Sequence, residues 1–483
     1  EFDRQLLDKF PPTISFSIPV TCGVNPRTFV ATINDATGVP TAGLGLPRLY
    51  WKINAGAWNT AISTYLSPTQ YQFTIDPGAT AIFGDVVSYY IVAQDVVAIP
   101  NVIAYPSTGA GGYTTSPPAA ATAPTTLYSY TVTPGLSGAY TVGAAGVYPT
   151  LTAAVAAYNT SCLSGPVTFN LIDPTYSTSE SFPIVISANT TASSTNTLTI
   201  KPAAGNAMAT ITGNNGSSLI KFNGADYVII DGSNNGTTSQ NLTINNSNAG
   251  SSATVLWIAS VTTDGATNNT IKNAIISGSN SSTTIFAIAA GSGASLGATA
   301  TAKNNNNTIT NCVLKAAQNG LWINGNPTLS QQDQNWVISN NTFGSASIAA
   351  EKMGFRGMIF INVDGFTITG NTINGVIVPS GFTSTASGIV IAGNCYNGTI
   401  SKNKISDIKQ QDSGGWGASG IYLGSEVSSN INVNNNFIWD VTGMGFSGTD
   451  HSDNGYGIMV DFGGGYNIHY NSILMGTNQS NAG

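Results

Sequence analysis

The chain has 483 residues, of which 8% are charged and 41% hydrophobic, and its formal net charge is −7. The hydrophobic fraction excludes wholesale disorder, and the absence of any Lys/Arg cluster excludes a nucleic-acid surface. No run of about 18 apolar residues occurs, so the sequence predicts no membrane-spanning helix.

The first part of the chain alternates apolar and polar residues in short runs, such as Phe29, Ala31 and Ile33. Runs of this kind, separated by Gly, Pro and Asn turns, predict the short strands of a β-sandwich. We therefore expect a lead-in over residues 1–10 and a sandwich over residues 11–107. The phrases RLYWKINAGAW and GDVVSYYIVAQD resemble bacterial immunoglobulin-like and fibronectin-III-like modules.

Residues 108–134 are rich in Pro, Gly, Ala and Thr, a composition that predicts a semi-extended linker. A further domain is expected over residues 135–483. Near its start, Thr150 can cap a short helix over about 150–158, where apolar residues recur at helical spacing. The stretch YTVGAAGVYPTLTAAVAAY resembles the opening of pectinesterase-like chains, and the resemblance implies a helix that plugs the first coil and hides its unpaired strand edges.

From about residue 271 onward one phrase returns: an aliphatic residue, two spacers, an asparagine, one spacer and another apolar residue. The asparagines of the five clearest copies lie 30, 32, 33 and 35 residues apart, a period that indicates stacked repeats. In a stack, each amide can bond to its copies above and below at ~4.8 Å and tolerate a left-handed bend. These ladder asparagines are Asn341, Asn371, Asn403, Asn436 and Asn471.

A second feature precedes each phrase, namely a glycine followed by apolar residues in a strand-length run. No helical spacing joins these runs, so each repeat is predicted to hold two or three short strands and no helix. A single unit cannot bury its apolar face, whereas stacked units share one continuous interior. The glycines are Gly320, Gly357, Gly388, Gly420 and Gly457.

Together the two features resemble the right-handed parallel β-helix of the pectin-lyase-like superfamily. The resemblance implies an asparagine ladder in the tight turn between the second and third strands of each coil. The predicted fold class is all-β: an N-terminal immunoglobulin-like sandwich, then a right-handed parallel β-helix with a short N-terminal capping helix. We also expect the native chain to continue beyond residue 483, because solenoids end in a cap.

The superfamily places its active sites on the outer face of the first strand of each coil. Because side chains alternate along a strand, four residues are predicted to point outward there, and they include no acid, base or cation. We interpret them as a candidate strip for binding sugar rings or a protein partner, with cover by long loops as the alternative. The strip consists of Trp322, Val390, Tyr422 and Met459.

Weak catalytic candidates are the acids just past such strands, Asp364, Glu426 and Asp461. Glycoside hydrolysis needs two carboxylates roughly 5 to 9.5 Å apart, a spacing that Glu426 and Asp461 could meet from neighbouring coils. Other ionisable residues in adjoining loops are Arg356, Lys352 and the His451/Asp453 pair. The Gly-His-Gly, Arg-x-Lys and acidic calcium motifs of superfamily enzymes are absent, so we expect no enzyme.

The four cysteines, Cys22, Cys162, Cys312 and Cys395, show no metal-knuckle spacing. Cys312 and Cys395 are expected roughly 14 Å apart along the stack, beyond disulfide reach, and are predicted to be free thiols, with Cys312 buried. The pairing of Cys22 and Cys162 stays open. We predict no cofactor and no metal site; the resemblance leaves calcium open, and no residue pattern supports it.

Two function classes remain. The first is a non-enzymatic extracellular adhesin or structural stalk, because the composition and the phrase TLTIKPAAG resemble large bacterial surface proteins exported by type IX secretion. That resemblance implies a cell-surface location, contact with the secretion machinery, and a glycan or surface protein as partner. The second is a polysaccharide lyase or hydrolase, and a variant of it keeps glycan binding without turnover.

Overall fold

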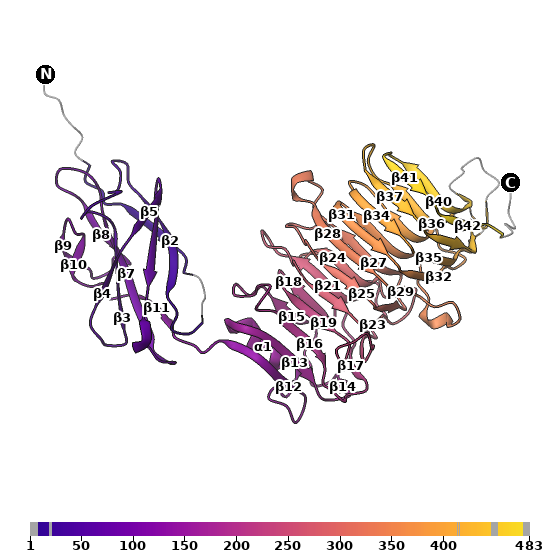
Figure 1. Ribbon diagram of the computed structural model, residues 1–483, viewed down its shortest axis with the longest axis horizontal. Helices are drawn as coiled ribbons and strands as arrows, with labels where there is room; N and C mark the ends of the chain where they lie inside the picture. The colour runs from indigo at the N-terminus through magenta and orange to yellow at the C-terminus, as the bar shows by residue number, and fades with distance from the viewer. Residues whose placement is uncertain (1–7, 19–21, 413, 415, 446–452, 477–483) are drawn as a thin grey trace, which may run out of the picture. The chain divides into compact units, whose positions relative to one another are not determined.

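The computed structural model describes residues 8–18, 22–412, 414, 416–445 and 453–476 (Figure 1). The chain divides into two compact units. The first comprises residues 1–136 and 162–164, and the second comprises residues 137–161 and 165–483. No helix within the described ranges is long and apolar enough to cross a membrane.

The first unit contains two larger antiparallel sheets that face each other across an apolar core, and a third sheet of two strands. One sheet has the order β1 (Thr13–Phe16), β2 (Arg27–Asn34), β6 (Gln70–Ile75) and β5 (Thr64–Ser67). The other has the order β11 (Tyr128–Thr131), β7 (Val86–Gln94), β3 (Arg48–Ile53) and β4 (Asn59–Ile62), with β8 (Val102–Tyr105) paired to β7. The predicted β-sandwich is therefore confirmed as paired antiparallel sheets.

Alternation along the strands explains the sandwich core. In β2 the residues are buried and exposed in strict turn, so Phe29, Ala31 and Ile33 all point inward. They pack with residues of the opposite sheet, including Leu49 and Trp51, in one apolar cluster. A sheet buried on one face needs this period of two.

The linker predicted over residues 108–134 is wrong. The segment forms β9 (Gly111–Thr114) and β10 (Ala119–Thr122), which pair with each other, and then β11, which pairs with β7. Tyr128 and Tyr130 align with Tyr89 and Val87 of β7 in that pairing. The prolines suggested a linker, but this strand is stabilised by its partner and by aromatic packing, including Tyr128 on Tyr89 with ring centroids 5.8 Å apart.

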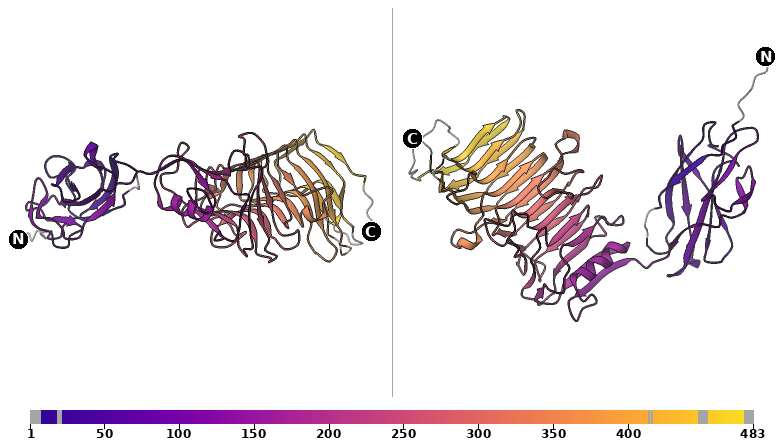
Figure 2. Two further views of the ribbon diagram at one scale, coloured as in Figure 1. Left: turned by 90° about the horizontal axis from the view of Figure 1, so that it is seen from below. Right: turned by 180° about the vertical axis from the view of Figure 1, so that it is seen from behind.

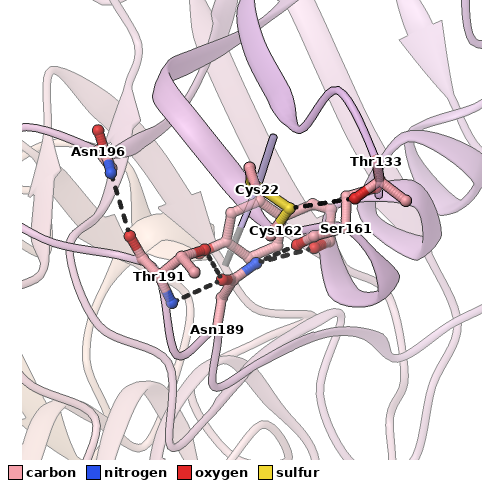
Figure 3. Close-up of a disulfide and its surroundings, with 8 residues drawn as sticks. Cys22, Thr133, Ser161, Cys162, Asn189, Thr191 and Asn196 are labelled. Atoms are coloured by element: carbon pink, nitrogen blue, oxygen red, sulfur yellow. Dashed lines mark hydrogen bonds between the residues drawn. A yellow bond between two sulfur atoms is a disulfide. The ribbon is translucent and has the colours of Figure 1, made fainter. Parts of the chain in front are cut away.

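A disulfide joins Cys22 to Cys162, which settles the pairing that the sequence left open. The Cα atoms are 5.6 Å apart and the two residues are separated by 140 positions in the sequence. The Thr133 Oγ1 lies 3.5 Å from the Cys162 sulfur, and the two groups are joined by a dashed line in Figure 3. As predicted, Cys312 and Cys395 are free and Cys312 is buried; Cys395 is buried as well. Burial raises the pKa of both thiols to about 12.

Helix α1 (Leu151–Thr160) lies at the first end of the solenoid, as predicted (Figures 1 and 2). The Thr150 side chain accepts a hydrogen bond from the Ala153 amide at 3.0 Å, so Thr150 is the N-cap. Glu180 adds a second cap that the sequence did not indicate, because its carboxylate accepts from the amides of Leu151 and Thr152. At the other end, the Asn189 amide donates to the carbonyls of Tyr158 and Ser161 (Figure 3).

The second unit is a parallel β-solenoid with three sheets, whose strands follow one another in each coil. The first solenoid sheet runs β15 (Ile184–Ser187), β18 (Ile220–Asn223), β21 (Thr254–Ser260), β24 (Phe286–Ser292), β27 (Asn319–Asn324), β30 (Arg356–Ile361), β33 (Ala386–Ile391), β36 (Ala418–Gly424), β40 (Gly455–Phe462). Figure 2 shows the coils stacked along one axis.

The second solenoid sheet runs β12 (Leu136–Val142), β13 (Leu163–Leu171), β16 (Leu198–Pro202), β19 (Val228–Asp231), β22 (Thr270–Lys272), β25 (Thr308–Thr310), β28 (Asp333–Ser339), β31 (Val363–Thr369), β34 (Tyr396–Ser401), β37 (Ile431–Asn434), β41 (Tyr466–His469). The third runs β14 (Thr175–Tyr176), β17 (Ala209–Gly213), β20 (Leu242–Asn246), β23 (Ala274–Ser277), β26 (Val313–Lys315), β29 (Thr342–Phe343), β32 (Thr372–Val378), β35 (Lys404–Gln410), β38 (Phe437–Trp439), β42 (Ser472–Leu474), with β39 (Val441–Thr442) on β35.

The ladder asparagines form one continuous column between the second and third sheets. The Asn403 Oδ1 accepts from the Asn371 backbone N–H and from its Nδ2, both at 3.0 Å. The Asn403 Nδ2 in turn donates to Asn436 at 2.9 Å and to the Ile368 carbonyl at 3.0 Å. The same bonds join Asn341 to Asn371 and Asn436 to Asn471. The predicted ladder is confirmed.

One detail of the ladder prediction is wrong. The left-handed residue at the bend is the one before each ladder asparagine, with φ between 55° and 68° at Asn340, Gly370, Lys402, Asn435 and Tyr470. The ladder residue itself must aim its amide into the stack, so the bend is made one position earlier. Asparagine or glycine suits three of these five positions because both tolerate a left-handed backbone.

The repeated glycine has a packing reason. A Cβ added at Gly388 would lie 2.5 Å from the carbonyl oxygen of Gly420 in the next coil and 2.6 Å from Cγ2 of Ile405. Ile405 belongs to the third sheet and points into the interior, where it is fully buried. The same two contacts recur at Gly357 and Gly420. Glycine is therefore required where the first sheet meets the third sheet across a narrow core.

Candidate functional site

A cavity of about 330 Å³ lies on the outer face of the first solenoid sheet, over β30, β33, β36 and β40. Its wall combines apolar side chains, hydroxyl groups, one guanidinium and one carboxylate. The lining residues are Arg356, Ile359, Thr385, Ser387, Val390, Gly417, Ala418, Ser419, Tyr422, Met459 and Asp461. A concave site with a few convergent polar groups is the usual form of a ligand-binding site.

The strand register builds this wall from two columns of residues. Ile359, Val390, Tyr422 and Met459 pair in succession across the four strands and form the first column. Arg356, Ser387 and Ser419 pair in the same way and form the second, polar column. The Ser387 and Ser419 hydroxyl oxygens are 3.0 Å apart. Three of the four predicted strip residues therefore lie in one wall of the cavity.

Trp322 belongs to the same column by register, since it pairs with Ile359. Its surroundings, however, differ from those of the cavity residues. The loop over residues 293–300 lies on Trp322, and the indole Nε1 donates to the Gly297 carbonyl at 3.2 Å. Its ring packs on Phe286 with centroids 5.0 Å apart, in a cluster that also contains Trp257 and Leu296. Trp322 is thus part of a loop-covered cluster and not of the cavity.

Asp461 is the one acid candidate that lines the cavity. The Tyr422 hydroxyl donates to its Oδ2 at 2.6 Å. Burial, with further contributions from this hydrogen bond and the Asp461 charge, raises the pKa of Tyr422 to about 12. The phenol therefore stays protonated near neutral pH and can donate a hydrogen bond, and it is a poor general base.

The other two acids lie elsewhere. Asp364, near the start of β31 in the second solenoid sheet, accepts amide hydrogen bonds from Asn397 at 2.7 Å and Gln334 at 3.3 Å. Glu426 follows β36 and does not line the cavity, and its backbone carbonyl accepts from the Gly464 amide. Of the two, Asp461 lines this cavity and Glu426 does not, and the spacing of their carboxylates stays a prediction.

Arg356 lies on β30 and not in a loop as the sequence suggested, and it contributes the cavity's cation. Its side chain is half-buried, and burial lowers its pKa from the ordinary value. Lys352 points to other partners, because it forms an ion pair with Asp407 on β35. His451 lies outside the described residues, so its pairing with Asp453 stays a prediction.

Within the described ranges, one group of acids has the geometry of a cation site. The carboxylate oxygens of Asp8, Asp35 and Asp95 all lie within 4.8 Å of one another in the sandwich unit. Asp95 is fully buried and accepts hydrogen bonds from the backbone and side chain of Asn101. The sequence gave no signal for this group, because its members are 27 and 60 positions apart.

No family model matches the chain, and no curated protein is a detectable relative. Among solved structures, a family 28 exopolygalacturonase of Yersinia enterocolitica is similar, with 9% sequence identity over 97% of this chain and 100% of that chain. The TM-score is 0.15, so no inference about this chain rests on that likeness.

Proposed function

We propose that the protein is a non-enzymatic, extracellular surface protein that binds a glycan in the cavity on its first solenoid sheet. The observation that carries the proposal is the composition of that cavity. Val390 and Met459 offer an apolar wall for the C–H face of a sugar, while Ser387, Ser419 and Tyr422 offer hydroxyl groups at its edge. Sugar rings are recognised by this combination of apolar contact and convergent hydrogen bonds.

The secreted, cell-surface location is part of the same proposal. The Cys22–Cys162 disulfide supports it, because disulfides persist in oxidising compartments outside the cytoplasm. The low content of charged residues is consistent with a repetitive scaffold whose polar groups bond in columns. A β-sandwich of immunoglobulin-like or fibronectin-III-like type before a solenoid fits an adhesin or stalk, and we extend the proposal to type IX secretion on the likeness of composition.

The competing function is polysaccharide cleavage, and one observation favours it. A cation, Arg356, and a phenol, Tyr422, face the same cavity, as a β-elimination site would require. Two features oppose it. The pKa of Tyr422 is raised to about 12, and the cavity holds one carboxylate among the described residues, whereas glycoside hydrolysis uses two.

Binding and turnover measured on the same glycans separate these functions. The purified chain is screened on a glycan array, and each bound oligosaccharide is incubated with the protein and analysed for shorter products. We expect binding without products, and loss of binding in Tyr422→Ala. The matched control is Phe437→Ala, an aromatic residue that is 46% exposed on the third solenoid sheet, outside the cavity. Product release would establish the enzyme, and no glycan binding at all would overturn the proposal.

A further inference from the structure

The guanidinium of Arg356 is distinguished by what it lacks. Among the described residues, the five ion pairs use Lys272, Lys315, Lys352 and Lys409, and none uses Arg356. The Arg356 side chain also makes no hydrogen bond within the described part of the chain, although its backbone amide bonds to the Gln318 carbonyl. A half-buried cation without a partner is unfavourable, because it loses water without gaining another acceptor.

The residue type adds a second indication. Arg356 is the only arginine between residues 137 and 483, where every other cation is a lysine. Arginine presents a planar fork of donors that matches two oxygens of a carboxylate or a sulfate, whereas lysine presents a point charge. The one arginine of the solenoid therefore lies in the wall of its cavity.

The surrounding groups favour a ligand anion over an internal partner. Asp461 is the cavity's carboxylate, and it accepts from the Tyr422 hydroxyl and forms no ion pair with Arg356. By register Arg356 pairs with Asn319 of β27 and with Ser387 of β33, and Ser387 pairs in turn with Ser419. The two serine hydroxyls lie 3.0 Å apart, so one of them donates to the other and the second can donate to an anion. Burial lowers the pKa of Arg356, and a bound anion would reverse that cost.

We propose that the cavity binds an anionic sugar residue, with the Arg356 guanidinium forming paired hydrogen bonds to two oxygens of its carboxylate or sulfate group. This inference rests on the proposed glycan binding and adds the charge of the ligand. The apolar wall of Ile359, Val390 and Met459 contacts the ring, and one hydroxyl of the Ser387/Ser419 pair donates a further hydrogen bond to the anion. Binding is then sensitive to salt, because the ion pair is screened.

The test measures affinity for four probes by calorimetry with the full chain: an oligoglucuronate, a sulfated galactan oligosaccharide, a neutral galactan oligosaccharide and inorganic sulfate. The two anionic oligosaccharides distinguish a carboxylate from a sulfate ester, and inorganic sulfate shows whether the anion alone suffices. We expect at least one anionic oligosaccharide to bind at least tenfold more tightly than the neutral one. Equal affinity for neutral and anionic oligosaccharides would overturn the inference and leave glycan binding intact.

The variants assign the effect to Arg356. Arg356→Met keeps the length of the side chain, and we expect a loss of at least tenfold in affinity for the anionic oligosaccharide with the neutral one unchanged. Arg356→Lys keeps the charge without the fork, and it should recover only part of the affinity. The control Lys404→Met removes an exposed cation of β35 and should change nothing. An anionic affinity that survives both Arg356 variants, or binding of no glycan at all, would overturn the inference.

If Arg356→Met does not fold, Arg356→Lys and the salt dependence of the native chain carry the test. We expect the affinity for the anionic oligosaccharide to fall as salt rises from 0.05 to 0.5 M, about as screening of one close ion pair requires. An affinity that does not change over this range, together with full retention in Arg356→Lys, would contradict the inference.

Discussion

The first solenoid sheet presents two different outer faces along its length. Over β21, β24 and β27 the loop of residues 293–300 covers Trp257, Phe286 and Trp322 and forms an apolar cluster. Over β30 to β40 a cavity remains, and the described segments beside it contribute residues such as Thr385 and Gly417 to its lining. The backbone register is the same in both stretches, since Trp322 and Val390 belong to one column.

The difference shows how a repeated scaffold acquires a local site. Coil stacking fixes where each outward position lies, and the loops between coils decide whether that position is covered. In the covered stretch large aromatic rings fill the space beneath a loop, whereas in the cavity stretch space remains beside Arg356 and Tyr422. Loops over a rigid framework carry the variable part of the surface.

The largest expected effect comes from breaking the asparagine ladder, which supports both the covered stretch and the cavity stretch. Asn403→Ala leaves the Asn371 backbone N–H and the Ile368 carbonyl without partners in the buried ladder. We expect the free energy of unfolding to fall by about 2–5 kcal/mol, because each buried unpaired group costs about 1–3 kcal/mol. Chemical denaturation measures the loss, and it should occur with or without ligand.

The matched control for the ladder is Asn432→Ala. Asn432 accepts an amide hydrogen bond from Asn467 at 3.1 Å on the outer face of the second solenoid sheet, and both residues are partly or fully exposed. A surface change of this kind should alter stability by under about 0.5 kcal/mol. Equal losses for Asn403→Ala and Asn432→Ala would show that the buried ladder is no more important than an exposed amide pair.

The next prediction concerns the covered stretch alone. Trp322→Ala removes the ring under the 293–300 loop, and we expect a loss of about 3 kcal/mol, near the low end for a buried aromatic residue because Trp322 is partly exposed. The loop should also become more sensitive to a protease, as read by mass spectrometry of the early cleavage products. Trp322→Phe retains most of the packing and should be milder. Unchanged protease sensitivity in Trp322→Ala would show that other residues hold the loop.

The smallest effect concerns a buried acid of the second solenoid sheet. Asp333 on β28 is fully buried, and burial raises its pKa to about 7 although its carboxylate accepts from the Asn304 amide at 2.9 Å. The folded-state pKa lies above the unfolded value near 4, so this group's contribution is fully present below about pH 4 and is lost as pH rises through about 7. Solenoid stability should therefore decline between pH 4 and pH 7.

Asp333→Asn tests this pH dependence. The amide cannot ionise, so the variant should lose that part of the decline and exceed the native chain by about 1–3 kcal/mol at pH 8, the scale of a buried polar penalty. Denaturant unfolding at pH 5 and pH 8 measures both quantities. The control Asp364→Asn replaces a carboxylate that accepts from two amides and should not gain stability at pH 8. An identical pH profile in Asp333→Asn would contradict the assignment.

Much of the fold could be predicted because it follows from residues that recur at a regular spacing in the sequence. The ladder spacing and the glycine before each strand run placed Asn371, Asn403 and Gly388 in their columns before any contact was known. The capping helix followed from Thr150 and the helical spacing after it. The segment of residues 108–134 was misread, because its strands depend on partners such as β7 that lie far away in the sequence.

The candidate site was only partly predictable. The sequence identified Val390, Tyr422 and Met459 as outward residues and included Asp461 among the acids, all of which line the cavity. It could not show that a loop covers Trp322, that Glu426 lies outside the cavity, or that Arg356 joins the wall from a strand. These outcomes depend on where irregular loops lie, and loops carry no period from which their positions follow.

By itself, then, the sequence determined the stacking of the coils, because a regular repeat of asparagine, glycine and aliphatic residues has one economical way to bury its apolar faces and pair its amides. Only the tertiary structure decided three features: the disulfide between Cys22 and Cys162, the boundary between the covered and the open part of the first sheet's outer face, and the residues that surround Arg356. Each of these is a contact between residues whose separation in the chain follows no repeat, so its formation depends on the folded arrangement as a whole.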